Sequence, residues 1–156
     1  MKLILGLFIV IVCLSAAQTE TVDTEPQGDA RMGAKHGRYF VVNSSGQVLQ
    51  RVFVKHHTVK NHDPNSGITT YTNLENNQLS HPTPFIYYNG AFSPFDHWYL
   101  EVTTQNGQIY KTKTNFYCNV SIMDNGDVYI TIDQNLKLKF TFSSSSSCTE
   151  ELLIQN

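Results

Sequence analysis

The stretch Leu136-Lys137-Leu138-Lys139-Phe140-Thr141-Phe142 alternates apolar and polar side chains almost without interruption. Successive side chains of a β-strand point to opposite faces of its sheet, so this alternation predicts a strand with one buried and one solvent-facing side. An amphipathic helix would instead repeat its apolar positions at intervals of three and four residues. The stretch therefore indicates β-structure that buries its leucine and phenylalanine side chains.

The same period of two continues toward the N-terminus and predicts further strands. Asn-Gly pairs at 89–90, 106–107 and 125–126 indicate tight turns between them. Roughly nine or ten short strands at this spacing favour an all-β fold, an antiparallel two-sheet β-sandwich, with a closed barrel as the alternative. An immunoglobulin domain does not fit, because Trp98 precedes both cysteines of the predicted body. The apolar positions expected inside are Trp98, Leu100 and Val102; Phe116, Cys118, Val120 and Ile122; and Val128, Ile130 and Ile132.

Three regions are expected along the chain. Residues 1–17 have the pattern of a signal peptide, because Lys2 precedes an apolar run of about 12–15 residues, too short to span a bilayer, and small residues follow. Residues 18–37 have no aromatic side chain and are rich in acidic residues and glycine, which predicts a flexible acidic leader. The β-sandwich domain is expected at 38–156. The predicted localisation is therefore secreted and extracellular.

Two cysteines remain in the mature chain that this division predicts. Cys13 falls within the predicted signal peptide, which leaves Cys118 and Cys148. An even pair in an oxidising compartment predicts one disulfide, closing a loop of about 30 residues. No Cys-x-x-Cys motif accompanies them, so we expect a structural bond rather than a metal site or a catalytic thiol.

Charge and motifs argue against several classes of function. The 11 Lys and Arg nearly balance the 13 Asp and Glu, so no basic surface for nucleic acid is predicted. The six histidines lack the spacing of metal ligands, and the adjacent His56 and His57 would point to opposite faces of one strand. No catalytic motif surrounds the serines or carboxylates. We therefore expect no metal, no cofactor and no enzymatic activity.

A dense group of aromatic side chains is the best candidate for a binding site. Seven of them fall between residues 85 and 99, among prolines and a glycine. Loops at the ends of sandwiches commonly carry binding function, and aromatic rings are suited to interfaces. Phe92 and Phe95 lie outside any strand phase, which favours exposure, whereas Trp98 is in phase with Leu100, which favours the core. The predicted ligand-binding residues are Tyr88, Phe92, Phe95 and Trp98.

Two acceptor sequences for N-linked glycans are present. They are Asn43-Ser44-Ser45 and Asn119-Val120-Ser121. Asn43 precedes a predicted turn, and Asn119 is on the outward phase of its predicted strand. We predict that both can be glycosylated in a secreted chain.

Several short motifs resemble a known family when taken together. The combination resembles small β-sandwich proteins named for their up-regulation in long-lived insulin-signalling mutant nematodes, which are similar in fold to the aegerolysins. The resemblance covers about residues 39–154 and implies a two-sheet sandwich without known enzymatic activity. Aegerolysins bind membrane lipids, but no agreed set of lipid-contacting residues transfers to this chain. The motifs are Ser93-Pro94-Phe95-Asp96-His97-Trp98, Lys-Thr-Asn-Phe-Tyr-Cys-Asn at 113–119, Asp124-Asn125-Gly126-Asp127-Val128 and Phe-Ser-Ser-Ser-Ser-Ser-Cys at 142–148.

We therefore expect a secreted, non-enzymatic binding module that recognises a lipid or membrane surface through exposed aromatic side chains. The alternative is a module that binds a glycan or a protein, as in extracellular defence or matrix proteins, and either could form oligomers. Liposomes and glycan arrays distinguish the two, because only the first kind of module would bind protein-free lipid.

Overall fold

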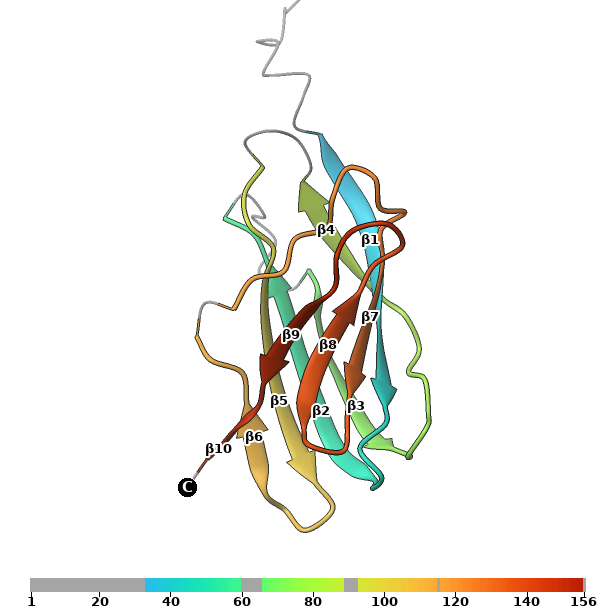
Figure 1. The fold of residues 1–156 in the computed structure, drawn as a ribbon, viewed down its shortest axis with the longest axis vertical. Helices are drawn as coiled ribbons and strands as arrows, with labels where there is room; N and C mark the ends of the chain where they lie inside the picture. Colours follow the sequence, from blue (N-terminus) through green and yellow to red (C-terminus); the bar gives the residue numbers. More distant parts are fainter. Residues whose placement is uncertain (1–32, 60–65, 89–92, 115, 156) are drawn as a thin grey trace, which may run out of the picture.

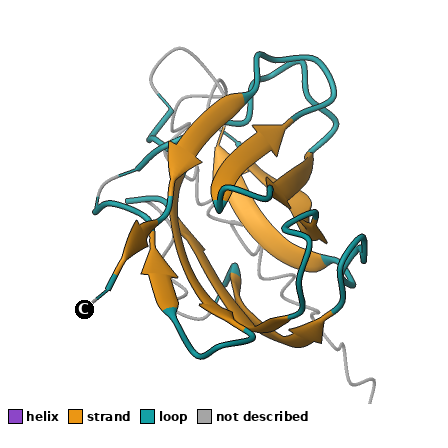
Figure 2. Ribbon diagram, turned by 60° about the horizontal axis from the view of Figure 1, so that its bottom comes forward, coloured by secondary structure: helices purple, strands orange, loops and turns teal. Residues whose placement is uncertain are grey.

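The architecture is all-β. The computed structural model describes residues 33–59, 66–88, 93–114 and 116–155, which form ten strands and no helix (Figures 1 and 2). The predicted signal peptide, residues 18–32 of the predicted leader and Phe92 lie outside these residues. In chain order the strands are β1 (Ala34–Asn43), β2 (Leu49–His57), β3 (Ile68–Leu74), β4 (Thr83–Tyr88), β5 (His97–Thr104), β6 (Ile109–Lys111), β7 (Asp127–Ile132), β8 (Lys137–Thr141), β9 (Cys148–Glu151) and β10 (Leu153–Ile154).

The strands form two five-stranded sheets that pack against each other. The first sheet has the order β4-β1-β7-β8-β9, and the second has the order β10-β6-β5-β2-β3. Neighbouring strands are antiparallel, except that β1 and β7 run parallel, from Arg38 opposite Asp127 to Asn43 opposite Ile132. The predicted two-sheet β-sandwich is thus confirmed, with one parallel pair that the sequence pattern did not indicate.

The core lies between the two sheets and consists of the inward-facing residues, every second one along each strand. In β5, Trp98, Leu100 and Val102 are at most 2 % exposed, while the residues between them are partly exposed. The Trp98 ring packs against Phe85 and Phe140, with ring centroids 5.4 and 5.3 Å apart. Its indole N–H donates to the carbonyl of Cys118 at 2.9 Å, so the one polar atom of the ring is satisfied inside the core.

The region 116–126 is not the strand that its alternation predicts. Its backbone is irregular, and Ile122, which the pattern places inside, is 69 % exposed. The N–H of Cys118 donates to the Asp96 carbonyl at 3.0 Å, and the N–H of Val120 donates to the Asp96 carboxylate at 2.9 Å. The prediction was wrong because a single buried aspartate accepts hydrogen bonds that a neighbouring strand would otherwise accept.

The first strand begins inside the predicted leader. β1 starts at Ala34, four residues before the predicted boundary, and residues 34–37 pair with the end of β4. The first three of these residues are exposed, so their sequence carries no apolar alternation. Backbone hydrogen bonding to β4 extends the strand where the side chains give no signal.

The two ends of the sandwich are built differently. At the turn end, the strands are joined by the segments 44–48, 75–82, 105–108 and 133–136. At the loop end, β2 and β4 finish while β5 and β7 begin (Figure 1). The described parts of the loop end are 58–59, 66–67, 93–96, 112–114, 116–126 and 142–147. Within the described residues, no helix has the length and apolarity to cross a membrane.

Candidate functional site

An exposed cluster of rings lies at the loop end, and we name it the aromatic cluster: Phe95, His97, Tyr117 and His57. The centroids of Phe95 and Tyr117 are 4.8 Å apart, and those of Phe95 and His97 are 6.5 Å apart. His57 and His97 stack at 5.1 Å. Phe95 and Tyr117 are each 54 % exposed. Two large rings therefore contact each other in solvent rather than in the core.

Three separate segments bring these rings together. His97 begins β5 and lies opposite His57, the last residue of β2. Tyr117 pairs with His97 through an isolated antiparallel bridge. Because β2 and β5 alternate, their neighbours His56 and Trp98 point inward while His57 and His97 point outward. The aromatic cluster therefore sits on the outer side of the second sheet.

Further apolar side chains are exposed elsewhere at the loop end. Val59 is 77 % exposed, Met123 is 74 % exposed and Ile122 is 69 % exposed. These are the highest values among the exposed large hydrophobic side chains of the described residues. Sequence reasoning missed all three, since Ile122 continues an inward phase and Val59 and Met123 follow no pattern.

A buried histidine–aspartate pair holds the segment that carries Phe95. His56 Nε2 lies 2.9 Å from Asp96 Oδ1, and both side chains are at most 1 % exposed. The other carboxylate oxygen of Asp96 accepts the N–H of Val120. The backbone N–H of Asp96 donates to Asn119 Oδ1 at 2.9 Å. One side chain thereby joins β2, the segment 93–96 and the segment 116–126.

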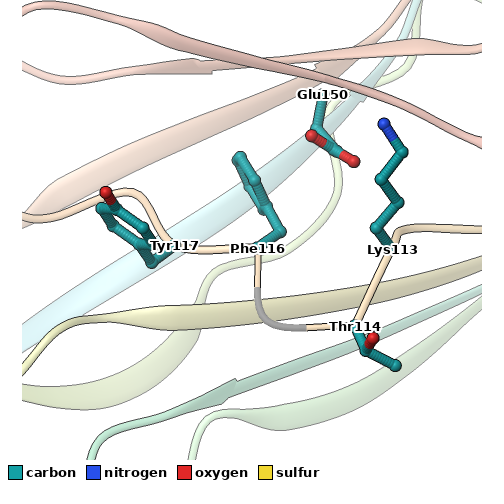
Figure 3. Close-up of a pocket in the computed structure, with 5 residues that line it drawn as sticks. All are labelled: Lys113, Thr114, Phe116, Tyr117 and Glu150. Atoms are coloured by element: carbon teal, nitrogen blue, oxygen red, sulfur yellow. The ribbon is translucent and has the colours of Figure 1, made fainter.

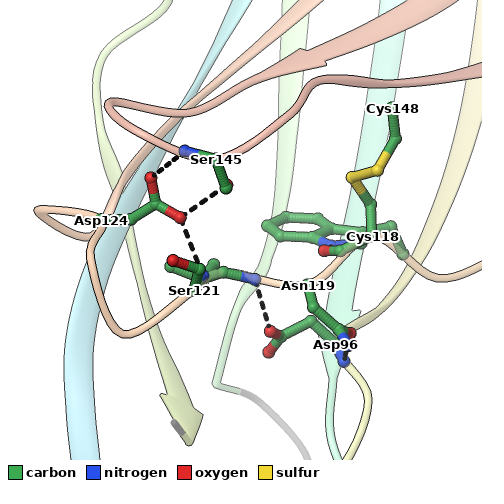
Figure 4. Close-up of a disulfide and its surroundings, with 9 residues drawn as sticks. Asp96, Cys118, Asn119, Ser121, Asp124, Ser145 and Cys148 are labelled. Atoms are coloured by element: carbon green, nitrogen blue, oxygen red, sulfur yellow. Dashed lines mark hydrogen bonds between the residues drawn. A yellow bond between two sulfur atoms is a disulfide. The ribbon is translucent and has the colours of Figure 1, made fainter.

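A second aspartate holds the turn that presents Met123 (Figure 4). Asp124 accepts the N–H groups of Ser144 and Ser145 at 2.8 and 3.0 Å, and that of Ser121 at 2.8 Å. The Ser145 hydroxyl donates to it at 2.7 Å. Although burial works against ionisation, the hydrogen bonds from Ser145, Ser121 and Ser144 hold the pKa of Asp124 at about 2.

The disulfide adds a covalent link to the same region. Cys118 and Cys148 are bonded, with their Cα atoms 6.1 Å apart, as predicted (Figure 4). The bond joins the segment 116–126 to β9 of the first sheet. The exposed side chains of the loop end are thus carried on segments fixed by two aspartates and one disulfide.

Charged groups on the outer faces of the two sheets form ion pairs with one another. Glu101 binds Arg51 and also Lys111, whose Nζ is 3.1 Å from Glu101 Oε2. Partial burial opposes ionisation of Glu101, but hydrogen bonds from Lys111 and Arg51 hold its pKa below the usual range. On the first sheet, Arg38 binds Asp127 through two nitrogens at 2.8 and 2.9 Å. These carboxylates are therefore already paired within the chain.

Desolvation lowers the pKa of His57, and the neighbouring His97, Lys55 and His56 lower it further. An ordinary histidine titrates near pH 6.5. His57 is therefore neutral at pH 7 and adds no positive charge to the aromatic cluster at that pH.

The predicted contact residues have different positions. Phe95 is exposed in the aromatic cluster, and its role as a ligand contact stays a prediction. Tyr88 ends β4 and is half-buried on the outward phase of the first sheet, so it is not part of the cluster. Phe92 lies outside the described residues. Trp98 is 2 % exposed, which corrects its assignment as a contact: its ring fills the core and no ligand can reach it without unfolding.

The two glycosylation sequences also differ. Asn43 is fully buried, and its Nδ2 donates to the carbonyls of Gln47 and Leu74, both at 2.8 Å. A glycan would replace one of the two hydrogens on that nitrogen and so remove one of these bonds, and a sugar would have to enter a fully buried site, so the prediction for Asn43 is corrected. Asn119 is exposed, and its Oδ1 accepts the N–H of Asp96, so a glycan on its Nδ2 stays a prediction.

A scan against known protein families and a search of curated proteins find no match to this chain. Among the residues that the structure describes, no group of three histidine, cysteine, aspartate or glutamate side chains is placed to hold a metal ion. The candidate site is therefore a surface of exposed rings and apolar side chains, on segments that two aspartates and a disulfide hold in place.

Proposed function

We propose that this chain is a secreted, aegerolysin-like module that binds a lipid membrane surface with its loop end. The observation that carries the proposal is the grouping of exposed apolar side chains from several segments at one end of the sandwich. They are Val59, Phe95, Tyr117, Ile122 and Met123, which are 54–77 % exposed. Burial of each such side chain is worth about 1.5–3 kcal/mol, so a few of them suffice for reversible binding.

The arrangement of charges supports an apolar mode of binding. Of the aspartates at this end, Asp96 is buried with His56, Asp124 is held by backbone and hydroxyl donors, and Asp127 is paired with Arg38. Each therefore needs fewer hydrogen bonds from water when the end approaches a bilayer. With a net charge of only −2, long-range attraction to lipid headgroups contributes little.

Secretion supports the proposal by giving access to a membrane surface. The apolar segment at the N-terminus has the pattern of a signal peptide. The Cys118–Cys148 disulfide is of the kind that persists in oxidising compartments. The resemblance of residues 39–154 to small aegerolysin-like sandwiches supports a lipid ligand.

The test is co-sedimentation with vesicles of phosphatidylcholine, sphingomyelin and cholesterol at about 0.15 M and about 1 M salt. We expect binding at both, because burial of apolar side chains is not screened, while the Debye length falls from about 8 to about 3 Å. The double variant Ile122→Ser/Met123→Ser and the single variant Phe95→Ala should each weaken binding about tenfold or more.

The matched control is Leu153→Ser/Ile154→Ser in β10, which removes two side chains that are 43 % and 51 % exposed away from the loop end. We expect this variant to bind as the unaltered chain does. Melting temperatures should change little in all three variants, because exposed side chains contribute little to folding. Equal loss of binding in the control and loop-end variants, or no binding by the unaltered chain, would contradict the proposal.

A further inference from the structure

A cavity of about 250 Å³ opens between Glu150 of β9 and the segment 113–117, which follows β6 (Figure 3). Pockets for drug-sized ligands measure about 300–1,000 Å³, so this cavity has room for about one small ring. Its lining combines two aromatic rings, a hydroxyl and two opposite charges. The lining residues are Lys113, Thr114, Phe116, Tyr117 and Glu150.

Glu150 brings an unpartnered acceptor to this cavity. Its Oε1 is buried and accepts no hydrogen bond from the described residues. The carboxylate points between the Phe116 ring and the Lys113 side chain (Figure 3). A buried acceptor without a donor destabilises a folded chain and is uncommon in native structures. Because this oxygen has almost no accessible surface, a ligand hydroxyl in the cavity would donate to it only after the Glu150 carboxylate rotates toward the cavity, and the unmet hydrogen bond favours that rotation.

The disulfide fixes the distance between the two walls of the cavity. Cys118 directly follows Tyr117, and Cys148 lies two residues before Glu150 on the same phase of β9. Phe116 is further held by packing against Phe140, with ring centroids 5.2 Å apart. The walls are therefore in place before a ligand arrives, which reduces the entropy lost on binding.

The lining selects the chemistry of the occupant. Lys113 and Glu150 balance each other, so a lone anion would face the carboxylate and a lone cation would face the ammonium group. An uncharged hydroxyl suits both, because it donates to a carboxylate and accepts from an ammonium group. The Phe116 and Tyr117 rings offer apolar surface to the C–H face of a sugar. We propose that this cavity binds one uncharged pyranose ring, the terminal sugar of a glycan.

Tyr117 also belongs to the aromatic cluster, so the cluster indicates where the rest of a bound glycan would lie. A glycan whose terminal ring fills the cavity would continue over Tyr117 toward Phe95, whose ring is 4.8 Å away. Tyr117 belongs to both proposed surfaces, but the polar groups that would select the sugar lie in the cavity and not among the exposed apolar side chains Ile122 and Met123.

The test is a titration of the oxidised protein with the methyl glycosides of glucose, galactose, mannose and N-acetylglucosamine, followed by NMR shifts of the Phe116 and Tyr117 rings. We expect at least one glycoside to saturate with a Kd of about 1 mM. Glu150→Gln should weaken this binding about tenfold, because it removes the charge on the unpartnered acceptor. The melting temperature of this variant should stay the same or rise.

The matched control is Glu151→Gln, which removes the same charge from the adjacent, exposed residue of β9 and should leave the affinity unchanged. The proposal is overturned if no glycoside binds, if Glu150→Gln binds as tightly as the unaltered protein, or if phosphocholine binds the cavity and the glycosides do not. Vesicle binding should be the same in Glu150→Gln and the unaltered protein. A failure of the sugar site would therefore leave the lipid proposal standing, and the reverse also holds.

Discussion

The turn end and the loop end close the same sandwich by different means. At the turn end, the side chains of Asn43, Asn106 and Asp133 accept hydrogen bonds from backbone or hydroxyl groups no more than four residues away. At the loop end, Asp96 and Asp124 accept from groups 24 and 20 residues away, and the disulfide joins cysteines 30 residues apart. The turn end also has long-range hydrogen bonds, from Asn43 Nδ2 to the Leu74 carbonyl and from the Gly46 N–H to Asn76 Oδ1. The two ends differ in their carboxylates and covalent links: Asp133 of the turn end accepts from nearby residues, whereas the loop end is held by two long-range aspartates and a disulfide.

This difference explains where exposed apolar side chains can be placed. A tight turn has few residues, and its polar side chains satisfy its own backbone. A longer segment needs support from other parts of the chain, and once supported it can present side chains such as Ile122 and Met123 to solvent. The long-range links therefore provide the rigid support on which a binding surface depends.

The largest expected effect comes from removing the disulfide. The variant Cys118→Ala/Cys148→Ala should lower the free energy of unfolding by about 3–4 kcal/mol, because a loop of about 30 residues is no longer closed in the unfolded chain. Urea unfolding measures this loss. If the loss were below about 1 kcal/mol, the disulfide would not be a principal link of the loop end.

The next effect is at Asp124. Replacement of Asp124 by Asn should lower the free energy of unfolding by about 2 kcal/mol at pH 7, because hydrogen bonds to a charged carboxylate are lost. The pKa of Asp124 is about 2 in the folded chain and 3.8 in its ordinary state, so its contribution is complete above about pH 5 and is lost as the pH falls toward 2.

Urea unfolding between pH 7 and pH 2 measures this dependence. The difference between the unaltered chain and Asp124→Asn should shrink as the pH falls through this range. The turn-end counterpart Asp133→Asn should cost less than about 1 kcal/mol, because it loses only two exposed backbone bonds. A difference at Asp124 that does not change with pH would show that the carboxylate charge is not what holds the loop.

A smaller effect on stability than at Asp124 is expected at Gly107 of the turn end. Gly107 has a φ of 83°, and a Cβ added there would meet no atom within 4 Å. Gly107→Ala should therefore cost about 1 kcal/mol from backbone strain alone. Vesicle binding should not change, since the turn is remote from the loop end. Weaker vesicle binding in this variant would remove the distinction between the two ends.

The sequence predicted the parts of the fold that depend on local patterns. The alternation at 136–142 and 98–102 predicted β8 and β5, and the Asn-Gly pair at 106–107 predicted the turn between β5 and β6. The alternation at 116–122 misled, because the buried carboxylate of Asp96, distant in sequence, replaces a partner strand. The pairing of distant side chains cannot be deduced from local periodicity.

The candidate site was predicted only in part, for the same reason. Phe95 was expected on the surface because it falls beside a proline and outside a strand phase. Its neighbour Tyr117 lies between Phe116 and Cys118, which were expected inside, and nothing in the sequence placed the rings of Phe95 and Tyr117 together. Asn43 was expected at an exposed turn, but its amide is buried between Gln47 and Leu74. Its polar side chain gave no sign that it would be buried.

The most direct test of the loop end as the binding surface is hydroxyl-radical footprinting of the unaltered protein with and without the vesicles described above. Met123, Phe95 and Tyr117 are exposed and carry readily oxidised side chains, and Tyr129, which is 40 % exposed on the outer face of the first sheet, is the internal reference. We expect vesicles to lower oxidation of Met123, Phe95 and Tyr117 several-fold and to leave Tyr129 unchanged. Protection of Tyr129 without protection of Met123 and Phe95 would contradict the account.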